Sequence, residues 1–592
     1  MVSGAAKKKK KRANAAAASA SSTSPSVPTS SLLVAVHARL ARELQERHDI
    51  VLVHTEEKGR CCLAPPQGFE PGRLLIEEDA YIWGNGEDDW CLECDDPSHA
   101  SSSCPRVLST YPPSLPPLLP AIEKWMEERL ERVQTLDRAR AWIKALVRLQ
   151  QEGREGGEEG GEEGGRWLDP LLALTACNID GCVKDAQKLA KKYPFLLPPS
   201  SSPSSSVALA ARLLSLLNTN SHELEELGPG SGLFLRACLL EHSCMPNCAF
   251  ATYGTRLRLV TLTAIEPHAP LSIDYANLYY SPVAARRRVL EETYGFTCSC
   301  PACRGDAPDR SRAFTCPSSS SPPLEGGREG GREGGCEGGV VCPFGDEEEQ
   351  EGGGRWECLR CGRRATEGEI KAFCAAEESV LEEDPVGIEE VDALLRATPL
   401  LHRSHFAVLN WVETVAHELA RDPSPGAAAE AVMAWERVLS TVNEGLSHFF
   451  PPKGGKGHAH HPELAALLDR LAQVKATVGD TAGAQECWRD AYQLASLLTR
   501  PDWVPTIDLR RLAEHPPTTR GEVLSYYAER IGTLKGIERE MKEEKRIAAS
   551  MGKEEQEHRW AALKERLGSE ATRKALEEEV RQGGRQRGRE GG

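Results

Sequence analysis

The chain has 592 residues and a formal net charge of −16, from 88 acidic and 72 basic side chains. This length exceeds what one hydrophobic core organises, so we expect two or three domains with linkers between them. The acidic balance argues against direct nucleic-acid binding as the main task of the molecule. No stretch approaches the ~18 consecutive apolar residues of a membrane span, and no apolar signal segment follows the lysine-rich start. We therefore expect no association with a membrane.

Residues 1–31 are rich in Ala, Ser and Pro and contain a basic run from Lys7 to Arg12. Such a composition cannot bury a core, so we expect a solvated, disordered tail. The basic run is also typical of a nuclear import signal. Because the tail has no acidic residue and much Ser, an organellar transit peptide is the rival interpretation. The expected location is the nucleus or cytoplasm, with organellar targeting left open.

The next part of the chain changes between helical and strand patterns. Residues 32–49 place apolar side chains at helical spacing, whereas short apolar runs at 50–54 and 74–76 indicate strands. Residues 118–218 again show the spacing of helices, interrupted at 153–165 by a Glu/Gly repeat that we interpret as a flexible acidic insertion. This half of the chain is therefore predicted to mix helices with short strands.

The C-terminal half is predicted to be helical. From 369 to 515 one helical pattern follows another. The runs 464–478 and 482–498 flank a Gly-Asp turn and resemble a tetratricopeptide (TPR)-like hairpin, although one hairpin does not define a repeat array. Residues 516–592 are highly charged and predict a solvated helix with a disordered Arg/Gly tail. The histidines at 458–461 lie beside Gly-rich sequence and are interpreted as a solvated loop.

The chain has 20 cysteines, and several of them are grouped at Cys-x-Cys or Cys-x-x-Cys spacing. Without a visible secretory signal, this grouping favours metal thiolates over disulfides. Cys298, Cys300 and Cys303 place three thiols within six residues. A tetrahedral zinc ion bound by these three thiolates needs a fourth ligand from elsewhere.

A second candidate metal group lies in residues 85–111, which contain Cys91, Cys94, His99 and Cys104. These four side chains suffice for one tetrahedral zinc knuckle. An exposed loop with unliganded thiols is the equally weighted alternative.

A third group lies in residues 306–368. Cys358 and Cys361 form a knuckle-like Cys-x-x-Cys-Gly sequence, and Cys316 and Cys342 precede them. The four thiols predict a second zinc ribbon interrupted by a Gly/Glu/Arg insertion. The alternative is that only the Cys358–Cys361 pair is ordered.

Three segments carry a further pattern. Residues 241–248 read Glu-His-Ser-Cys-Met-Pro-Asn-Cys, residues 271–275 read Leu-Ser-Ile-Asp-Tyr, and residues 294–303 read Tyr-Gly-Phe-Thr-Cys-Ser-Cys-Pro-Ala-Cys. Together they resemble the signature of SET-domain lysine methyltransferases, in particular the SET-and-MYND (SMYD) family. There the pattern is Asn-His-Ser-Cys-x-Pro-Asn, a strand ending in Tyr, and a post-SET Cys-x-Cys-x-x-Cys. Here Glu241 replaces the first Asn.

The resemblance implies an α+β fold class. A SET-type β fold would occupy residues 32–305, with a degenerate MYND-like knuckle at 85–111, a helical insert at 118–218 and a post-SET zinc site at 294–305. The possible second zinc module and an all-α, TPR-like C-terminal domain would follow it.

The resemblance also implies site residues. Cys244 would supply the fourth zinc ligand to the Cys298, Cys300 and Cys303 triplet. Tyr275 matches the catalytic tyrosine and Tyr294 a tyrosine of the substrate channel. The pocket for S-adenosylmethionine (SAM) would include Lys58, Gly59, Arg60, Asn220 (with Asn218 as its alternative), Glu241, His242, Tyr275 and Phe296. Asn247 matches the Asn that supports the knot-like crossing of the two central motifs.

The implied function is SAM-dependent methylation of lysine side chains in a protein, either a histone tail or another protein, with the helical domain available to protein partners. The substitution at Glu241 favours an alternative, a catalytically degenerate SET fold that acts as a zinc-stabilised interaction scaffold. A DNA-binding zinc protein is a weaker third reading, because no basic face interleaved with aromatic residues is visible.

Overall fold

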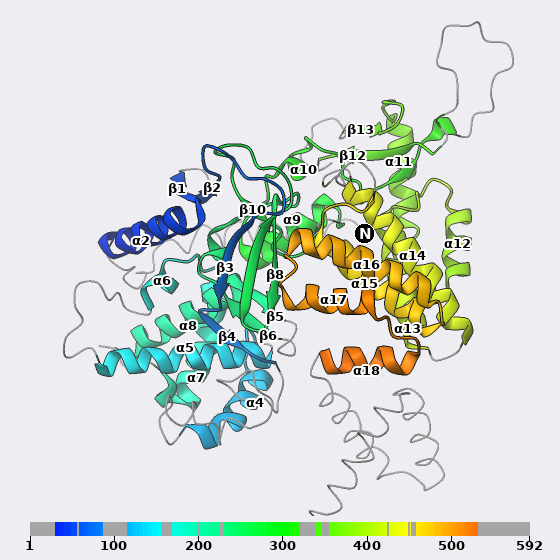
Figure 1. Ribbon diagram of the computed structural model, residues 1–592. Helices are drawn as coiled ribbons and strands as arrows, with labels where there is room; N and C mark the ends of the chain where they lie inside the picture. Colours follow the sequence, from blue (N-terminus) through cyan, green and yellow to red (C-terminus); the bar gives the residue numbers. More distant parts are fainter. Residues whose placement is uncertain are drawn as a thin grey trace, which may run out of the picture. The chain divides into compact units, whose positions relative to one another are not determined.

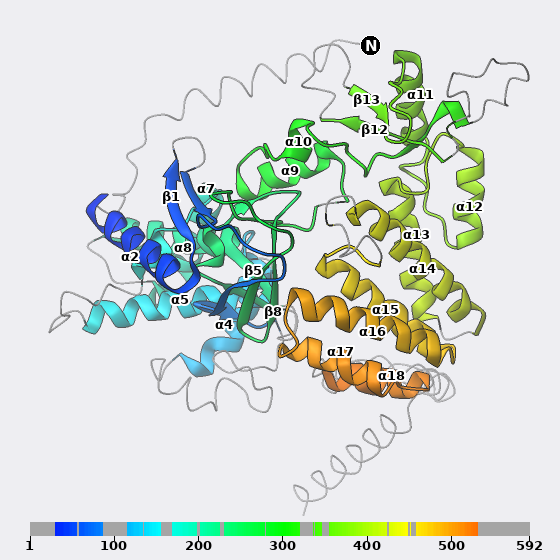
Figure 2. The same cartoon turned by 45° about the horizontal axis from the view of Figure 1, so that its top comes forward.

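The computed structural model describes residues 30–55, 59–86, 115–133, 135–155, 168–197, 202–224, 230–278, 280–319, 336, 338–345, 355–422, 425–447, 450 and 457–530. Within these residues the chain mixes helices with short strands, as the sequence pattern predicts (Figures 1 and 2). Among the described helices, none combines the length and the apolar character that crossing a bilayer requires.

The chain divides into two compact units. The first unit comprises the described parts of residues 1–47, 81–222 and 230–238. The second unit comprises the described parts of residues 48–80, 223–229 and 239–592. Both units draw on separate stretches of sequence.

The first unit is mainly helical. Its helices are α2 (Ser30–His48), α4 (Leu119–Arg129), α5 (Leu136–Glu155), α6 (Leu168–Leu172), α7 (Ile179–Lys192) and α8 (Pro203–Asn220). Strands β4 (Ile82–Gly84) and β6 (Gly230–Leu233) belong to this unit, as does the beginning of β5 (Ser221–Leu224), and their order in a small sheet is β4, β6 and β5. The helices after residue 118 agree with the spacing of apolar residues in the sequence.

Helix α5 is buried along most of its length. The Trp142 indole nitrogen donates a hydrogen bond to the Ala210 carbonyl of α8 at 3.0 Å. The guanidinium of Arg140 is paired with Glu123 of α4 at 3.1 Å, and both side chains are buried. Such a pair specifies how α4 and α5 pack, because either charge alone in that environment would be strongly destabilising.

Strand β4 passes close to the beginning of α5, and Gly84 makes this approach possible. A Cβ atom at Gly84 would lie 1.9 Å from the carbonyl oxygen of Asp137. No side chain fits at that distance, so the contact between strand and helix requires glycine at this position.

The second unit begins with three small sheets. Strands β1 (Val51–Thr55) and β2 (Gly59–Leu63) form an antiparallel hairpin. A twisted antiparallel sheet has the order β3 (Leu74–Asp79), β9 (Arg256–Thr261) and β8 (Cys248–Tyr253). Strands β7 (Glu241–His242) and β10 (Ser272–Ile273) form a parallel pair of only two residues each. The strands expected near residues 50–54 and 74–76 are therefore present.

A three-stranded ribbon follows. Helices α9 (Val283–Tyr294) and α10 (Pro301–Arg304) lead into it, and its antiparallel strands have the order β11 (Phe314–Thr315), β12 (Val340–Phe344) and β13 (Arg355–Cys358). These strands lie within the segment predicted to form a second cysteine module.

The rest of the second unit is a succession of helices. They are α11 (Glu367–Glu378), α12 (Ile388–Ala397), α13 (Phe406–Arg421), α14 (Pro425–Ser447), α15 (Pro462–Thr477), α16 (Thr481–Leu498), α17 (Val504–Glu514) and α18 (Arg520–Arg530). From α13 to α17 each helix packs against the next (Figure 1). The helical hairpin predicted around the Gly-Asp turn at 479–480 is present as α15 and α16.

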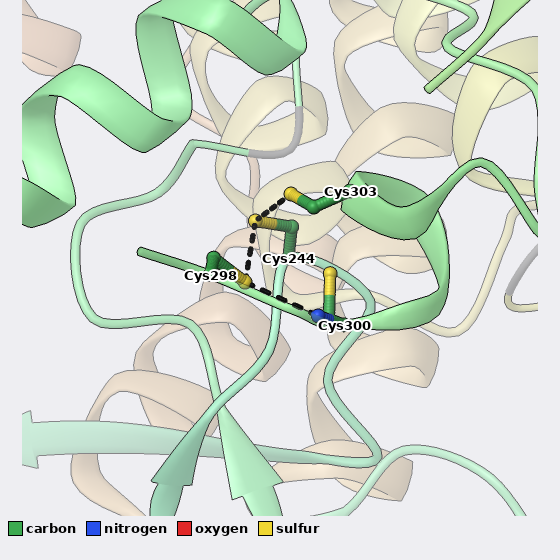
Figure 3. A group of neighbouring side chains, drawn as sticks. All are labelled: Cys244, Cys298, Cys300 and Cys303. Carbon is green, nitrogen blue, oxygen red and sulfur yellow. Dashed lines mark hydrogen bonds between the residues drawn. The ribbon is translucent and has the colours of Figure 1, made fainter. Parts of the chain in front are cut away.

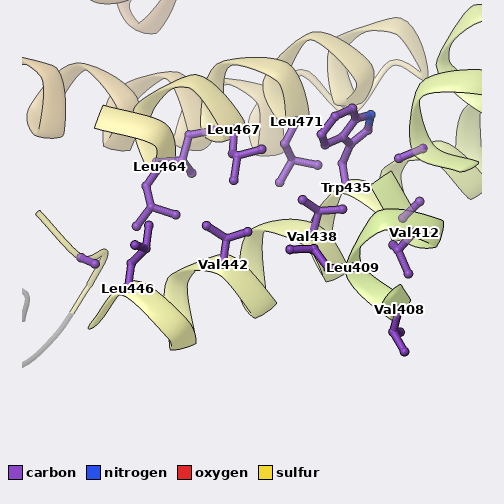
Figure 4. Packing of buried hydrophobic residues seen from close by; sticks show 14 of the residues in the cluster. Val408, Leu409, Val412, Trp435, Val438, Val442, Leu446, Leu464, Leu467 and Leu471 are labelled. Atoms are coloured by element: carbon purple, nitrogen blue, oxygen red, sulfur yellow. The ribbon is translucent and has the colours of Figure 1, made fainter. Parts of the chain in front are cut away.

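The core of these helices consists of aliphatic side chains at helical spacing. Trp435, Val438 and Val442 of α14 face Leu464 and neighbouring leucines of α15 (Figure 4). All of these side chains are buried. Burial of each such side chain contributes roughly 1.5–3 kcal/mol, which explains why the amphipathic pattern alone predicts this region.

Two buried histidines begin helices in this region. His405 precedes α13, and its Nδ1 accepts a hydrogen bond from the Ala407 amide. His461 precedes α15, and its Nδ1 accepts from the Glu463 amide at 3.3 Å. The expectation of a solvated loop at 458–461 is therefore wrong for His461, which is buried as a helix cap.

Candidate active site and metal centres

The segment that begins at Glu241 crosses a second segment that begins at Ser272. Glu241 pairs with Ser272 and His242 with Ile273 in the parallel ladder of β7 and β10. Asn247 fastens the crossing. Its Oδ1 accepts from the Ser272 amide at 2.9 Å. Its Nδ2 donates to the main-chain carbonyl of residue 270 at 2.8 Å. Two stretches about 25 residues apart are thus held side by side by one amide side chain.

The hairpin of β1 and β2 lies against the same crossing. The Leu271 amide donates to the Cys62 carbonyl at 2.7 Å. The Cys62 thiol donates to the Leu239 carbonyl at 3.6 Å. The pKa of Cys62 is raised to about 12, mainly by burial and to a smaller extent by Cys61 and the Glu241 carboxylate, while Arg60 opposes the shift. The hydrogen bonds of Cys62 with Leu271 and Leu239 hold strand β2 beside the crossing.

Four aromatic side chains gather at the crossing. The ring centroids of His242 and Tyr275 are 5.2 Å apart, and those of Tyr275 and Tyr294 are 5.1 Å apart. Phe296 lies 5.9 Å from His242 and 6.4 Å from Tyr275. These are the tilted and edge-on arrangements that aromatic pairs prefer. The four residues come from β7, the end of β10, and the segment that ends α9.

Hydrogen bonds fix the orientation of the two tyrosines. The Tyr275 hydroxyl donates to the Leu240 carbonyl at 2.6 Å. The Tyr294 hydroxyl donates to the Tyr275 carbonyl at 3.1 Å. Each phenolic proton is thereby directed to main chain, so the oxygen lone pairs are the acceptors that these groups can offer to another molecule.

His242 is held on both sides of its ring. Its Nδ1 accepts from the Tyr275 amide at 3.2 Å, and Nε2 lies 3.3 Å from the Cys244 sulfur. Its side chain is 1% exposed. The imidazole therefore links the aromatic group to the cysteines, and its two nitrogens are committed to the protein itself.

The first cysteine group consists of Cys244, Cys298, Cys300 and Cys303 (Figure 3). All four thiols are buried, and their sulfur atoms lie within 4.8 Å of one another. Cys244 Sγ is 4.0 Å from Cys298 Sγ and 3.6 Å from Cys303 Sγ. This donor set fits a tetrahedral zinc ion, for which four cysteine thiolates are one of the usual ligand sets in structural sites. The structure thus brings the triplet together with the fourth cysteine that the resemblance implied.

Gly295 allows the chain to turn from α9 towards the triplet. Gly295 caps the C-terminal end of α9: its φ is +74°, and its amide donates a hydrogen bond to the Glu291 carbonyl. This left-handed backbone conformation strongly favours glycine. The helix therefore ends at Tyr294, and Phe296 and the three cysteines follow within residues 296–303.

The thiols influence one another electrostatically. Hydrogen bonding from the Cys244 thiol lowers the pKa of Cys298 and lowers that of Cys300 to about 6. Hydrogen bonding with Cys298 in turn raises the pKa of Cys244. Some members of the group are therefore favoured as thiolates even before a cation is considered, which is the form that binds a metal.

A buried ion pair lies beside this group. Arg286 of α9 is paired with Asp309 at 3.4 Å, with side-chain exposures of 3% and 2%. Asp309 also accepts from the amides of Val283 and Ser311 and from the Ser311 hydroxyl. Its own amide donates to the carbonyl of residue 343 on β12. Arg286 and Asp309 thus connect α9 to the ribbon. No motif in the sequence predicts this contact.

The second cysteine group differs in one member from the prediction. Cys316, Cys358 and Cys361 lie together as expected, but the fourth sulfur is that of Cys336 and not that of Cys342. Cys342 is opposite Glu357 in the ladder of β12 and β13, whereas the neighbouring Val341 is opposite Cys358. Because side chains alternate between the two faces of a strand, Cys342 points to the face opposite to Cys358.

The other predicted residues are placed by the elements that carry them. Gly59 and Arg60 begin β2. Asn220 ends α8 in the first unit, where its amide donates to the carbonyls of Thr175 and Leu216. The alternative, Asn218, donates to the carbonyl of residue 132 in the same unit. Lys58, the basic run at the start of the chain, and the group Cys91, Cys94, His99 and Cys104 lie outside the described residues.

A small cavity of about 30 Å³ adjoins the first cysteine group. Cys244, Arg286 and Asp309 line it together with Tyr280 and Arg310. The Tyr280 hydroxyl donates to the main-chain carbonyl of residue 441 on α14 at 3.2 Å. A volume of this size holds one or two water molecules and is too small for a cofactor.

The chain is 31% identical to N-lysine methyltransferase SMYD2-A of Danio rerio over 121 residues, which are 20% of this chain and 28% of that protein. It is 32% identical to N-lysine methyltransferase SMYD2 of Mus musculus over 108 residues, 18% of this chain and 25% of that protein. It is 34% identical to protein-lysine N-trimethyltransferase SMYD5 of Mus musculus over 84 residues, 14% of this chain and 20% of that protein.

The matched segments span between a fifth and just over a quarter of the length of these relatives. No protein-family profile matches the chain. The partial matches nevertheless relate this chain to SMYD-type protein-lysine methyltransferases at low identity. They support a methyltransferase relationship at the level of the family.

Proposed function

We propose that the chain is a SAM-dependent methyltransferase that transfers methyl groups to lysine side chains of proteins. The observation that carries this proposal is the convergence of Tyr275, Tyr294 and Phe296 on His242, directly beside the four-cysteine group. The three motif segments that resemble a SET domain meet there: β7 pairs with β10, and the Tyr294 hydroxyl donates to the Tyr275 carbonyl. The relationship to SMYD lysine methyltransferases supports the same conclusion.

The residues present fit a cationic methyl donor and a cationic substrate. Aromatic faces attract cations, and the rings of Tyr275, Tyr294 and Phe296 lie within 6.5 Å of one another between centroids. The Glu241 carboxylate lies on the adjacent strand β7 and adds negative charge. When bound, SAM supplies an electrophilic methyl group on a positively charged sulfur. Gly59 and Arg60 on β2, with Glu241 and Phe296, are the described residues that we assign to its binding.

The tyrosines would align the acceptor. The Tyr275 oxygen is fixed by the hydrogen bond that it donates to Leu240, so its lone pairs can accept an N–H of the substrate amine and orient the nitrogen. Tyr294, fixed in turn on the Tyr275 carbonyl, would form a second wall of the channel. The lysine must be neutral to attack, and removal from water lowers the pKa of an ammonium group in that direction.

The first cysteine group would bind zinc for a structural reason. The loop from 298 to 303 has few apolar side chains of its own, so a metal that links it to Cys244 would hold Phe296 and Tyr294 against His242. In this account the zinc ion completes the wall of the pocket and takes no part in the transfer.

The test is incubation of the full chain with SAM carrying a labelled methyl group and a mixture of histones and cell-extract proteins. The proposal predicts label on lysine, which mass spectrometry of the modified peptides would locate. If no label is transferred and no SAM binds in a calorimetric titration, the proposal is wrong.

One observation favours a second function. Glu241 stands where the related signature has Asn, and a carboxylate there repels the carboxylate of SAM. The alternative is therefore a protein that has kept the fold and its metal centres as an interaction scaffold. Replacing Glu241 by Asn separates the two: a large gain in SAM affinity supports the scaffold, and an unchanged affinity supports a working enzyme that tolerates Glu.

We propose in addition that helices α12 to α17 contact protein partners and that the protein acts in the nucleus or cytoplasm. The basis is the size of the helical region and the basic run of the N-terminal tail. Localisation of a tagged chain with and without that run tests the second statement.

A further inference from the structure

We propose that Cys316, Cys336, Cys358 and Cys361 bind a second zinc ion, and that this metal centre stabilises the ribbon on which the helical region packs. The inference is independent of the methyl-transfer proposal, because it concerns a separate group of thiols. It also replaces the ligand set that spacing alone suggests, since Cys336 takes the place of Cys342.

The geometry of the four thiols is that of a single site. Their sulfur atoms all lie within 4.8 Å of one another, and Cys336 Sγ is 3.6 Å from Cys358 Sγ. Cys316, Cys336 and Cys358 are buried, and Cys361 is exposed. The four come from different stretches of the ribbon: the end of β11, the turn before β12, the end of β13 and the loop after it. Four thiolates that converge in this way are the donor set of structural zinc.

The backbone leaves room for the sulfur atoms at Gly339. A Cβ at this position would lie 2.3 Å from Cys336 Sγ and 2.9 Å from Cys358 Sγ. The Gly339 amide donates to the Cys336 carbonyl, and its carbonyl accepts from the Cys316 amide, both at 2.9 Å. The hydrogen bonds of Gly339 therefore hold the main chains of Cys336 and Cys316 in place. The missing side chain at Gly339 leaves the room that the cysteine sulfur atoms occupy.

The segment from Cys358 to Gly362 has the form of a metal-binding knuckle. The amides of Arg360 and Cys361 both donate hydrogen bonds to the Cys358 sulfur. The Gly362 amide donates to the Cys358 carbonyl at 2.9 Å, and Gly362 has a φ of +72°. Amide donors directed at a sulfur stabilise a thiolate, which is the protonation state that a metal needs.

The alternation of side chains in β12 excludes Cys342 from the site. Val341 faces Cys358 across the ladder, so the side chain of Cys342 lies on the other face, opposite Glu357. There it is buried near Arg310, whose positive charge lowers the thiol pKa against the dominant effect of burial, which raises it. A buried thiol with a raised pKa behaves as a small apolar side chain. Cys342 therefore serves as an internal control for the ligand set.

The ribbon is the surface against which α11 and α13 pack. Phe314 of β11 stacks on Phe373 of α11 with centroids 4.9 Å apart, and Trp356 of β13 stacks on the same ring at 5.8 Å. Arg312 is paired with Glu377 of α11 at 2.6 Å. The metal centre would hold β11, β12 and β13 in the register that these contacts need. Loss of the metal is therefore expected to loosen the adjacent helices as well as the ribbon.

The test is the zinc content of the purified full chain, measured by inductively coupled plasma mass spectrometry, in matched variants. Cys336→Ser is expected to contain about one zinc ion per chain less than the wild type, and Cys342→Ser is expected to match the wild type. Equal zinc content in Cys336→Ser and the wild type would overturn the proposal. So would a loss confined to Cys342→Ser.

Cys361→Ser addresses the case in which Cys336→Ser does not fold. Cys361 is exposed, so its replacement leaves the core intact, and the variant is expected to release one zinc ion to a chromogenic chelator at least ten times faster than the wild type. Gly339→Ala is expected to show the same accelerated release, because its methyl group occupies the space of the sulfurs.

The alternative pairing of the four thiols as disulfides is tested on the wild type. The chain is unfolded in a chelator without reductant, and its thiols are alkylated. All four cysteines are expected to carry the alkyl group; disulfide-linked peptides among them would overturn the proposal. Methyl transfer plays no part in these measurements, so an inactive protein that still binds this zinc would contradict only the proposed function.

Discussion

The hydroxyl of Tyr275 donates a 2.6 Å hydrogen bond to the carbonyl oxygen of Leu240, 35 residues earlier in the chain. Leu240 immediately precedes Glu241 and His242, which form the strand that crosses β10. The tyrosine is therefore fastened to the segment that carries the candidate cofactor residues. Its ring contacts His242 at a centroid distance of 5.2 Å, which joins the hydroxyl, the crossing and the cysteine group into one assembly.

Replacing Tyr275 by Phe is expected to reduce the rate of methyl transfer by about a hundredfold, because the oxygen that orients the amine is lost. The loss of one hydrogen bond should lower the free energy of unfolding by only about 1 kcal/mol. SAM affinity should change less than threefold. Tyr253→Phe is the control, because Tyr253 is exposed at the end of β8. Equal rates in the two variants would remove Tyr275 from the catalytic role.

Asn247 is predicted to hold the crossing of β7 and β10 together. Asn247→Ala loses the bonds with Ser272 and residue 270 and is expected to destabilise the crossing by roughly 1–3 kcal/mol. Hydrogen exchange measured by mass spectrometry should then accelerate in residues 241–248 and 271–275, by about tenfold for each 1.4 kcal/mol. Asn247→Asp keeps the acceptor oxygen and should show a smaller effect. Exchange that is unchanged in both variants would show that the crossing does not depend on this amide.

The buried pair of Arg286 and Asp309 is expected to matter far more than an exposed pair nearby. Arg286→Met leaves the Asp309 carboxylate buried without its cation, which should lower the free energy of unfolding by about 3–5 kcal/mol. Arg304→Met is the matched control, since Arg304 and Asp306 are 58% and 59% exposed and their pairing contributes about 0–1 kcal/mol. Urea unfolding followed by tryptophan fluorescence compares the two. A similar small effect for both would mean that Asp309 is satisfied by its amide donors alone.

His461 should make the helical region sensitive to acid. Burial lowers the pKa of His461 to about 4 from an ordinary value of 6.5. Between these two values the unfolded chain binds a proton that the folded chain does not, so stability falls as the pH decreases from about 6.5 to 4 and is fully present above 6.5. The contribution of this one residue amounts to roughly 3 kcal/mol at most.

His461→Asn keeps an acceptor for the Glu463 amide but cannot take up a proton. Its thermal midpoint should therefore fall less between pH 7 and pH 5 than that of the wild type. His268→Asn is the control, because His268 is exposed. If the pH dependence of His461→Asn equals that of the wild type, the histidine is not responsible for it.

Much of the helical region could be predicted from the sequence, because helices α13 to α16 bury regular apolar stripes and α15 and α16 flank a Gly-Asp turn. The proximity of Cys244 to the triplet was implied by resemblance only. Nothing in local sequence indicates that a residue 54 positions upstream would arrive beside Cys298. That contact depends on how β7 and β10 cross, which is a property of the folded chain.

The ligand set of the ribbon shows why spacing alone was insufficient. Cys342-Pro and Cys316-Pro look alike in sequence, whereas Cys336 lies in a Gly-rich insertion that predicts no structure. Whether Cys342 can join the site depends on whether its side chain lies on the same face of the sheet as that of Cys358. That is set by the pairing register of β12 with β13, and a shift of one residue in this register would reverse the face. Gly339 lies close to the sulfur atoms of Cys336 and Cys358, which marks Cys336 as a member of the site. This closeness can be recognised only once the register of β12 and β13 is known.

The central claim is that the first cysteine group completes a pocket for SAM. Its most direct test is a calorimetric titration of SAM into three proteins purified in the presence of zinc: the wild type, Cys298→Ser and Cys336→Ser. The account predicts binding by the wild type in the micromolar range, on the order of 1–100 μM. It predicts at least a tenfold loss of affinity in Cys298→Ser, whose thiolate links the loop to Cys244, and a change of less than threefold in Cys336→Ser. A wild type that binds no SAM, or a Cys298→Ser variant that binds it as tightly as the wild type, would contradict the account.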